Sequence, residues 1–150
     1  MKYHWMFDLD NTVVDNMHRE HFIKREDPDW VGFHEYDQVM KDPAREWTQG
    51  LWEKGVFKYG THSFLTARDE RCRQATMDQL LKLEMIPDMT SVPVIMKPAK
   101  WKEESKYYKA RELLTVLADP EMHVVFVEDL LHIITTLDDL NHPRLVVLDA

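Results

Sequence analysis

The chain has 150 residues and carries 27 acidic against 19 basic side chains, which gives a formal net charge of −8. Its length fits one domain and its hydrophobic content of 44% fits one core, so a disordered chain is excluded, and the acidic balance argues against a protein that coats a nucleic-acid duplex. All four glycines lie between residues 32 and 60 and none precedes Lys-Ser or Lys-Thr, which excludes a P-loop and a G-x-G-x-x-G dinucleotide turn.

Five short apolar runs have the length and the β-rich composition of strands. They are Tyr3–Phe7, Thr61–Leu65, Ser91–Met96, Met122–Val127 and Arg144–Leu148. Helical spacing of apolar residues follows in three segments between the later runs: Asp69–Leu83, Lys102–Leu117 and Leu130–Leu137. This alternation predicts an α/β fold, a Rossmann-like three-layer sandwich with a mainly parallel five-stranded sheet. The apolar run Val124–Val127 is expected to be a strand buried on both faces.

The interval between the first two runs breaks the alternation. It contains every glycine and three of the five tryptophans. His18–Lys24, Val31–Met40 and Ala44–Lys54 are each predicted to be helical, with Asp-Pro breaks at 27–28 and 42–43. We therefore expect a small, cap-like helical insertion over about residues 16–60, within a single domain that covers residues 1–150.

The sequence also indicates the environment of the protein. Cys72 is the single cysteine, which excludes an internal disulfide and a cysteine-rich zinc module. The first residues lack a signal-peptide pattern, and no stretch approaches the ~20 apolar residues needed to cross a bilayer. We expect a soluble, cytoplasmic protein with no membrane partner and no disulfide partner, and nothing in the sequence indicates its oligomeric state.

The segment FDLDNT (7–12) carries the strongest chemical signal. Asp8 ends the first predicted strand and Asp10 follows two residues later, so extended geometry places both carboxylates on the same side. Such a pair repels unless a cation joins it, which predicts a metal site, although a solvated loop has the same local pattern. A calcium loop counted from Asp8 is excluded, because Val13 occupies its glycine position and Arg19 its terminal glutamate position.

Further candidate site residues follow other predicted strands or lie on the helix between them. They are Thr66, Ala67, Arg68, Lys106, Lys109, Glu128 and Asp129. Ligands bind at the carboxyl ends of parallel strands, and these positions meet there. Acids, a hydroxyl group and a lysine at one edge of the sheet predict a site for a metal and a phosphoryl group.

In this order the motifs FDLDNT (7–12), FLTAR (64–68), a helix lysine and FVED (126–129) resemble those of the haloacid dehalogenase-like phosphatase superfamily, over nearly the whole chain. Further segments, MHRE (17–20), DW-x-x-F (29–33), DP (42–43) and LTARDERCRQAT (65–76), are similar to the 3′-phosphatase domain of phage-type polynucleotide kinases. The spacing to Glu128 favours Lys109 over Lys106 as the motif lysine. Asn11 replaces a usual glycine, Lys97-Pro98 replaces a common Arg-Pro, and the region of Ser105 lacks an acid often found there.

The resemblance implies a Mg²⁺-dependent phosphomonoesterase with an aspartyl-phosphate intermediate. It implies Asp8 as the nucleophile and Asp10 as the acid and base, a role that requires a raised pKa for Asp10. It further implies that Thr66 and Lys109 contact the phosphoryl group, and that Thr12, Ala67 and Arg68 contact the substrate. The implied metal residues are Asp8, Asp10 through its backbone carbonyl, Asp129 and Glu128. Glu128 would either bind the metal directly or support the residues that do.

The implied substrate is the 3′-phosphate of a nucleic-acid end or of a nucleotide. A small-molecule 5′(3′)-nucleotidase and a catalytically silent scaffold of the same fold are the alternatives, and the charge of −8 favours the smaller substrate. A signalling receiver domain is excluded, because the third predicted strand ends at Met96-Lys97-Pro98, without the acid that accepts phosphate there.

Several side chains have two interpretations from sequence alone. Arg68 is either a surface residue at a helix start or a phosphate ligand. Trp30 and Phe33 are either core residues of the insertion or a surface on which a base stacks. His18 and His21 have zinc-ligand spacing but no third ligand at a suitable distance along the chain.

Overall fold

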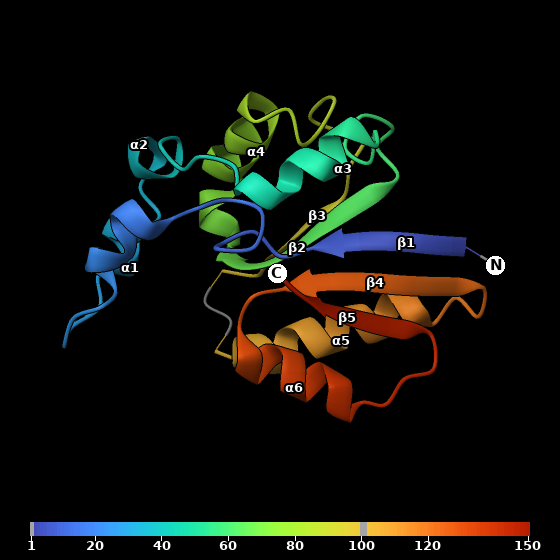
Figure 1. Cartoon of the computed structure of the whole chain (residues 1–150). Helices are drawn as coiled ribbons and strands as arrows, with labels where there is room; N and C mark the ends of the chain where they lie inside the picture. Colours follow the sequence, from blue (N-terminus) through green and yellow to red (C-terminus); the bar gives the residue numbers. More distant parts are fainter. Residues whose placement is uncertain (1, 100–101) are drawn as a thin grey trace.

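The computed structural model describes residues 2–99 and 102–150. It contains one five-stranded sheet in the order β3-β2-β1-β4-β5, and every neighbouring pair is parallel (Figure 1). The strands are β1 (Lys2–Phe7), β2 (His62–Asp69), β3 (Val94–Lys97), β4 (Met122–Glu128) and β5 (Leu145–Asp149). The sheet and its crossover helices confirm the α/β, Rossmann-like fold expected from the sequence.

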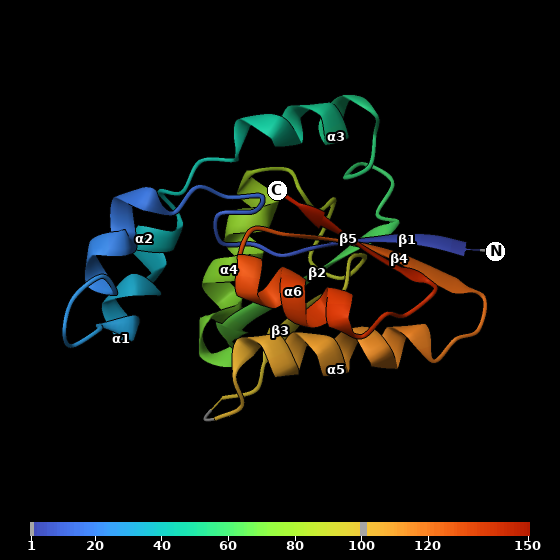
Figure 2. The same ribbon diagram turned by 60° about the horizontal axis from the view of Figure 1, so that its bottom comes forward.

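Helices cover both faces of the sheet. Helices α3 (Gln49–Glu53) and α4 (Arg73–Lys82) lie on one side, and α5 (Ser105–Leu117) and α6 (Leu131–Asp139) on the other (Figures 1 and 2). Consecutive residues of a strand point to opposite faces. Met6 of β1 accordingly packs with the α5 and α6 side, and Phe7 packs with the α4 side.

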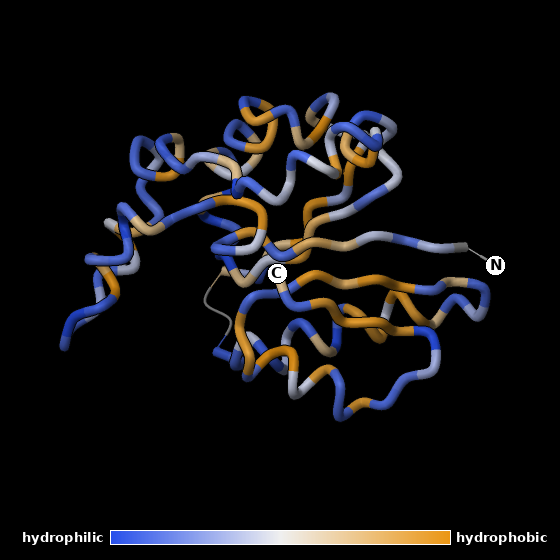
Figure 3. The backbone as a smooth tube through the Cα atoms, in the orientation of Figure 1, coloured by the Kyte–Doolittle hydropathy of each residue, from blue (hydrophilic) through white to orange (hydrophobic). Residues whose placement is uncertain are grey.

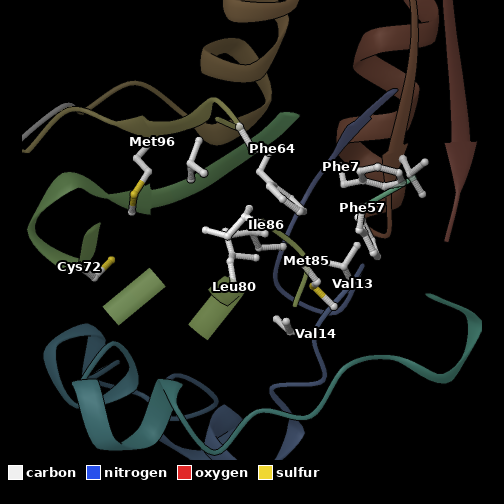
Figure 4. Close-up of a cluster of buried hydrophobic side chains, with 14 residues drawn as sticks. Phe7, Val13, Val14, Phe57, Phe64, Cys72, Leu80, Met85, Ile86 and Met96 are labelled. Atoms are coloured by element: carbon white, nitrogen blue, oxygen red, sulfur yellow. The ribbon is translucent and has the colours of Figure 1, made fainter. Parts of the chain in front are cut away.

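Two hydrophobic clusters result from this alternation. Phe7, Phe57 and Phe64 belong to the cluster on the α4 side, where the loop after β1 adds Val13 and Val14 (Figure 4). The strand β4, which lies between β1 and β5, is coloured as hydrophobic over most of its length (Figure 3). Burial on both faces explains why its run of apolar residues is nearly continuous.

The register of the central strands brings their carboxyl ends together. Phe7 of β1 pairs with Phe64 of β2 on one side and with Val127 of β4 on the other. The residues that follow these positions therefore emerge at one edge of the sheet. Asp8 and Glu128 are among them.

Two strand boundaries differ from the sequence prediction by more than one residue. Strand β2 continues to Asp69 rather than ending at Leu65, with a shift in its register against β3 between Thr66 and Asp69. Strand β3 begins at Val94 rather than Ser91, because the Asp88 carboxylate accepts hydrogen bonds from the following backbone amides and holds residues 88–91 in a turn.

The insertion contains shorter helices than predicted. They are η1 (Met17–Phe22), α1 (Trp30–Phe33), α2 (Tyr36–Val39), η2 (Glu46–Thr48) and α3. The helix expected over Val31–Met40 is interrupted because Glu35 has extended backbone angles, φ −59° and ψ 140°. In both views α1 and α2 project beyond the carboxyl ends of the strands (Figures 1 and 2).

None of the helices in the described part of the chain has the length and apolar composition needed to cross a membrane.

Candidate active site

Asp8 is the first residue after β1, and only 5% of it is exposed. Its amide donates to the Val127 carbonyl at 3.0 Å, so Asp8 remains in register with β4. Lys109 Nζ donates to Asp8 Oδ1 at 2.7 Å, and Thr12 Oγ1 donates to Asp8 Oδ2 at 2.8 Å. Both oxygens of this carboxylate are therefore held, one by a helix and one by the loop after β1.

The lysine that reaches Asp8 is Lys109. It lies on the buried face of α5, and its Nζ also donates to Glu128 Oε2 at 2.6 Å. Lys106 lies one turn earlier, with a side chain 28% exposed and its Nζ 3.8 Å from a Glu104 oxygen. The geometry thus places Lys109, the residue favoured by the motif spacing, beside Asp8.

Two more acids stand at the end of β4. Glu128 is fully buried, and its Oε1 accepts from the backbone amides of Asp129 at 3.0 Å and Leu130 at 3.2 Å. Asp129 is half-buried, and its Oδ1 lies 3.2 Å from Thr12 Oγ1. Because both Glu128 oxygens are engaged, Glu128 is arranged to orient its neighbours rather than to face the cavity.

The acidic cluster has the electrostatics of a cation site. Burial, together with the nearby Glu128, raises the pKa of Asp8 to about 7, and burial also raises the pKa of Asp129. Burial alone would lower the pKa of Lys109, but the carboxylates of Asp8 and Glu128 raise it, so the ammonium stays charged. One ammonium does not balance three carboxylates, and a second cation would relieve the remaining repulsion.

The donor set fits Mg²⁺. Asp8, Glu128 and Asp129 each offer a carboxylate oxygen, and these oxygens lie within 4.8 Å of one another. Hard oxygen donors of this kind are those that Mg²⁺ prefers. Asp10 was expected to bind the metal through its backbone carbonyl, and its side chain is bound by two arginines instead of joining this acidic cluster.

Asp10 is held by two arginines. Arg68 grips it in a bidentate manner, with Nε donating to Oδ2 at 3.0 Å and Nη2 donating to Oδ1 at 2.7 Å. Arg19 Nη2 donates to the same Oδ1 at 2.8 Å. Arg68 is 1% exposed, so its interpretation as a surface residue at a helix start is wrong.

The ligand-free protein does not by itself supply the raised pKa that the role of an acid requires of Asp10. Partial burial alone would raise the pKa of Asp10, but the guanidinium groups of Arg68 and Arg19 hold it well below its usual range. Asp10 is therefore ionised at neutral pH in the ligand-free protein.

The arginine pair belongs to a buried network that joins the insertion to the sheet. Arg19 Nε and Nη2 donate to the two oxygens of Asp42 at 2.9 and 2.7 Å, and both residues lie in the insertion. Gln79 of α4 donates to Asp42 at 3.0 Å and accepts from Arg68 at 2.9 Å. Sequence reasoning gave Arg19 and Asp42 no role, although they lie in the MHRE and DP segments.

The histidine pair of the insertion does not converge on a common point. His18 Nε2 lies 2.7 Å from Asp42 Oδ1, so this ring is part of the buried network. His21 Nδ1 lies 3.1 Å from the His18 backbone carbonyl. Neither belongs to the acidic group described above.

The turn after β1 explains one departure from the motif. Asn11, at the position of the usual glycine, has a left-handed backbone with φ 59°. Asparagine tolerates this region better than most residues, so the turn keeps its shape. The Leu9 carbonyl accepts from the amides of Thr12 and Val13, which fixes the Thr12 hydroxyl between Asp8 and Asp129.

A cavity of about 940 Å³ lies between this edge of the sheet and the insertion. Its lining includes the predicted residues Asp8, Asp10, Thr66, Ala67, Arg68, Lys109 and Asp129. Thr66 is buried, and its hydroxyl accepts from the Arg68 amide at 3.1 Å. Thr12, expected to contact substrate, is instead fully buried and bonded to the acids.

Comparison with solved structures places this architecture among known folds, while no family model matches the chain and no curated protein sequence matches it. A chain of the Pnkp1/Rnl/Hen1 RNA repair complex is similar over 99% of this chain, with a TM-score of 0.67 and 14% identity. The class C acid phosphatase from Bacillus anthracis, solved with tungstate bound, is similar over 99%, with a TM-score of 0.61 and 16% identity. The haloacid dehalogenase-like hydrolase SP0104 from Streptococcus pneumoniae is similar over 96%, with a TM-score of 0.61 and 12% identity.

These neighbours share the fold of this chain, which confirms the resemblance at that level: the chain has the haloacid dehalogenase-like fold. The chain covers a different share of each neighbour's length. The chain spans 42% of the RNA repair chain, 66% of the acid phosphatase and 92% of SP0104.

Proposed function

We propose that this protein is a Mg²⁺-dependent phosphomonoesterase that forms an aspartyl-phosphate on Asp8. The arrangement around Asp8 carries the proposal. Its buried carboxylate ends the central strand, opens to a cavity, and is held by Lys109 and Thr12 beside Asp129. A carboxylate fixed in this way, next to groups that neutralise charge, is suited to attack an anionic ester.

Asp8 and Asp129 would hold the ion, with the backbone carbonyl of Asp10. When bound, Mg²⁺ would neutralise charge on the phosphoryl oxygens and keep Asp8 ionised. Glu128 would support the ion indirectly, because it ties Lys109 and the amides after β4 into place. Thr66 and Lys109 would contact the phosphoryl oxygens.

In the first step a carboxylate oxygen of Asp8 forms a bond to phosphorus, and the bond from phosphorus to the ester oxygen breaks. The leaving oxygen takes a proton from Asp10. In the second step water attacks the acyl-phosphate, Asp10 accepts a proton from that water, and Asp8 and inorganic phosphate are released.

Asp10 must gain a proton before the first step, because its arginines keep it ionised in the free protein. An anionic phosphate bound beside Asp10 raises its pKa by repulsion. The same phosphate competes for the guanidinium groups that stabilise the ionised form. Substrate binding would thus prepare Asp10 as an acid, and the arginines would restore it as a base afterwards.

The proposed substrate is the 3′-phosphate of a polynucleotide end or of a nucleotide. The neighbour from an RNA repair complex supports a nucleic-acid end. A small-molecule 5′(3′)-nucleotidase is the second candidate, supported by the acidic net charge and by the likeness in fold to an acid phosphatase.

The reaction class is tested with p-nitrophenyl phosphate. The purified protein is expected to release p-nitrophenol with Mg²⁺ and to stop when EDTA removes the metal. Asp8→Asn is expected to be inactive, while Asp139→Asn, at an exposed position on α6, serves as the matched control. Turnover by Asp8→Asn at the wild-type rate would refute the nucleophile, and no turnover by any preparation would leave the silent scaffold.

The substrate is tested separately by comparing kcat/KM on three phosphate esters. They are a 3′-phosphorylated oligonucleotide, a 3′-mononucleotide and a 5′-mononucleotide. The oligonucleotide is expected to be the best of the three. A clear preference for the 5′-mononucleotide would favour the second candidate, whereas a preference for the 3′-mononucleotide would favour the 3′-phosphate of a nucleotide over that of a polynucleotide end.

A further inference from the structure

Trp30 is an exposed aromatic residue in the lining of the cavity that contains Asp8. It is 55% exposed, whereas Trp47 and Trp52 are each 37% exposed. Among the four tryptophans at positions 5, 30, 47 and 52, which the structure describes, Trp30 alone lines this cavity. Its neighbour Phe33 is only 3% exposed. The two interpretations from sequence therefore divide: Phe33 is a core residue of the insertion, and Trp30 is not.

The indole of Trp30 contacts two other aromatic rings, those of His34 and Phe33. The His34 ring is stacked with it, with centroids 6.1 Å apart and planes at 21°. Phe33 meets both rings edge-on, at 5.7 Å from Trp30 and 4.9 Å from His34. A ring fixed in this way offers a stacking face at a low cost in conformational entropy.

This aromatic group is connected to Asp10 through Arg19. The Arg19 guanidinium carbon lies 4.2 Å from the Phe33 ring centroid, and Arg19 Nη1 donates to the Phe33 carbonyl at 2.7 Å. The same guanidinium donates to Asp10 at 2.8 Å. The position of Trp30 relative to Asp10 is thus set by direct contacts, and a ligand on the indole has a defined relation to the phosphate site.

The cavity combines polar and apolar lining. Asp8, Thr66 and Lys109 supply the polar groups, whereas Trp30 and the 46% exposed Leu130 supply apolar surface. A ligand that matches both has a phosphate and, attached to it, a flat ring with an exposed π face. A nucleoside phosphate has this chemistry, and base stacking on an aromatic side chain tolerates every base.

We infer that Trp30 stacks on the nucleobase of the terminal nucleotide, so that the site recognises a phosphorylated nucleoside rather than the phosphate ester alone. This inference rests on the proposed function and specifies its substrate. It predicts dependence on the presence of a base and little dependence on which base is present.

The kinetic test uses two oligonucleotides that differ only at the 3′-phosphorylated residue, which is thymidine in one and an abasic tetrahydrofuran in the other. The measured quantity is the ratio of kcat/KM for the two substrates. Trp30→Ala is expected to lower this ratio about tenfold, the order of one lost stacking contact. Trp30→Phe is expected to keep most of it, and Trp52→Ala on α3, outside the cavity, is the matched control.

An equal loss on both oligonucleotides in Trp30→Ala, or a wild-type ratio near one, would overturn the inference while leaving the phosphatase intact. Trp30→Phe provides the same test if the alanine variant is unstable.

A binding measurement separates the inference from the proposed function. Thymidine 3′-monophosphate is titrated into the Asp8→Asn protein, and the indole N–H signal of Trp30, assigned by its loss in Trp30→Phe, is followed by NMR. Stacking is expected to shift this signal more than that of Trp52. An unmoved Trp30 signal in a protein that hydrolyses phosphate esters refutes the stacking alone. Absence of turnover with a shifted signal refutes the phosphatase and keeps the nucleotide site.

Discussion

Asp8 and Asp10 are two residues apart, yet they occupy opposite electrostatic environments. Asp8 lies among other acids with one lysine, and burial raises its pKa to about 7. Asp10 lies between Arg19 and Arg68, which bring its pKa well below the usual range. Two like groups whose pKa values are displaced in opposite directions are the pattern expected when they perform different tasks.

The two environments also differ in the elements that build them. The surroundings of Asp8 come from strand ends and from α5, all parts of the sheet and its covering layers. Those of Asp10 come partly from the insertion, through Arg19 and Asp42. The first environment is thus a property of the fold, while the second depends on how the insertion docks.

The largest effect is expected when Asp10 itself is replaced. Asp10→Asn keeps the shape but removes the acid and base, so kcat on p-nitrophenyl phosphate is expected to fall by about 10²- to 10⁴-fold. Asp27→Asn, at an exposed position of the insertion, should leave kcat unchanged. A variant at position 10 with wild-type kcat would show that the arginine-bound carboxylate takes no part in proton transfer.

Arg19→Met tests whether the buried ion pairs of Arg19 stabilise the surroundings of Asp10. The change leaves the fully buried Asp42 carboxylate without its bidentate partner, which is expected to lower the free energy of unfolding by about 3–5 kcal/mol. The matched pair at the surface is Arg71 with Asp69, where Arg71→Met should cost much less because solvent screens the charges. Urea denaturation measures both, and equal small losses would contradict the difference between the two pairs.

The sheet was predictable because its signal is local. Five apolar runs and their intervening helical patterns lie within short windows, and the motif acids follow those runs directly. The buried face of α5 was harder to predict: its apolar residues Tyr107 and Leu114 are exposed, whereas Lys109 is buried. Hydrophobic spacing does not reveal a face that turns to bury a charged lysine against two carboxylates.

The helix boundaries within the insertion and the arginine network were not predictable, for a physical reason. Arg68 meets Asp10 across 58 positions of sequence, and no local period reports such a contact. The helices of the insertion have three to six residues, too few for a 3.6-residue period to be recognised. Their order depends on docking through Arg19 and Asp42 rather than on their own propensity.

On the Asp8 side, Lys109→Met and Lys106→Met form a matched pair on one helix. Removal of the Lys109 ammonium leaves Asp8 and Glu128 repelling one another and removes a charge that would stabilise the phosphoryl group. We expect a loss of about 10²- to 10³-fold in kcat. Lys106→Met should retain kcat within about twofold, because Lys106 does not reach the acids. Equal losses in the two variants would show that α5 acts through its packing.

The smallest effect is a pH-dependent difference in stability between Asp8→Asn and the wild type, both in EDTA. Asp8 loses its proton near pH 3.9 when unfolded but near pH 7 when folded, so unfolding releases a proton in this window and wild-type stability falls as pH rises. Asp8→Asn removes this contribution. Its melting temperature should equal that of the wild type near pH 4, exceed it increasingly up to pH 7, and exceed it by a constant amount above pH 7.

Asp10 contributes with the opposite sign, because its arginine pairs stabilise the fold above pH 3.9 and lose that contribution as pH falls. Between pH 4 and 7 the contribution of Asp10 is therefore nearly constant, and that of Asp8 changes. Mg²⁺ at pH 8 should then stabilise the wild type more than Asp8→Asn. A lead that stays constant from pH 4 to 8 would contradict the raised pKa of Asp8, and with it the contrast between the two carboxyl groups.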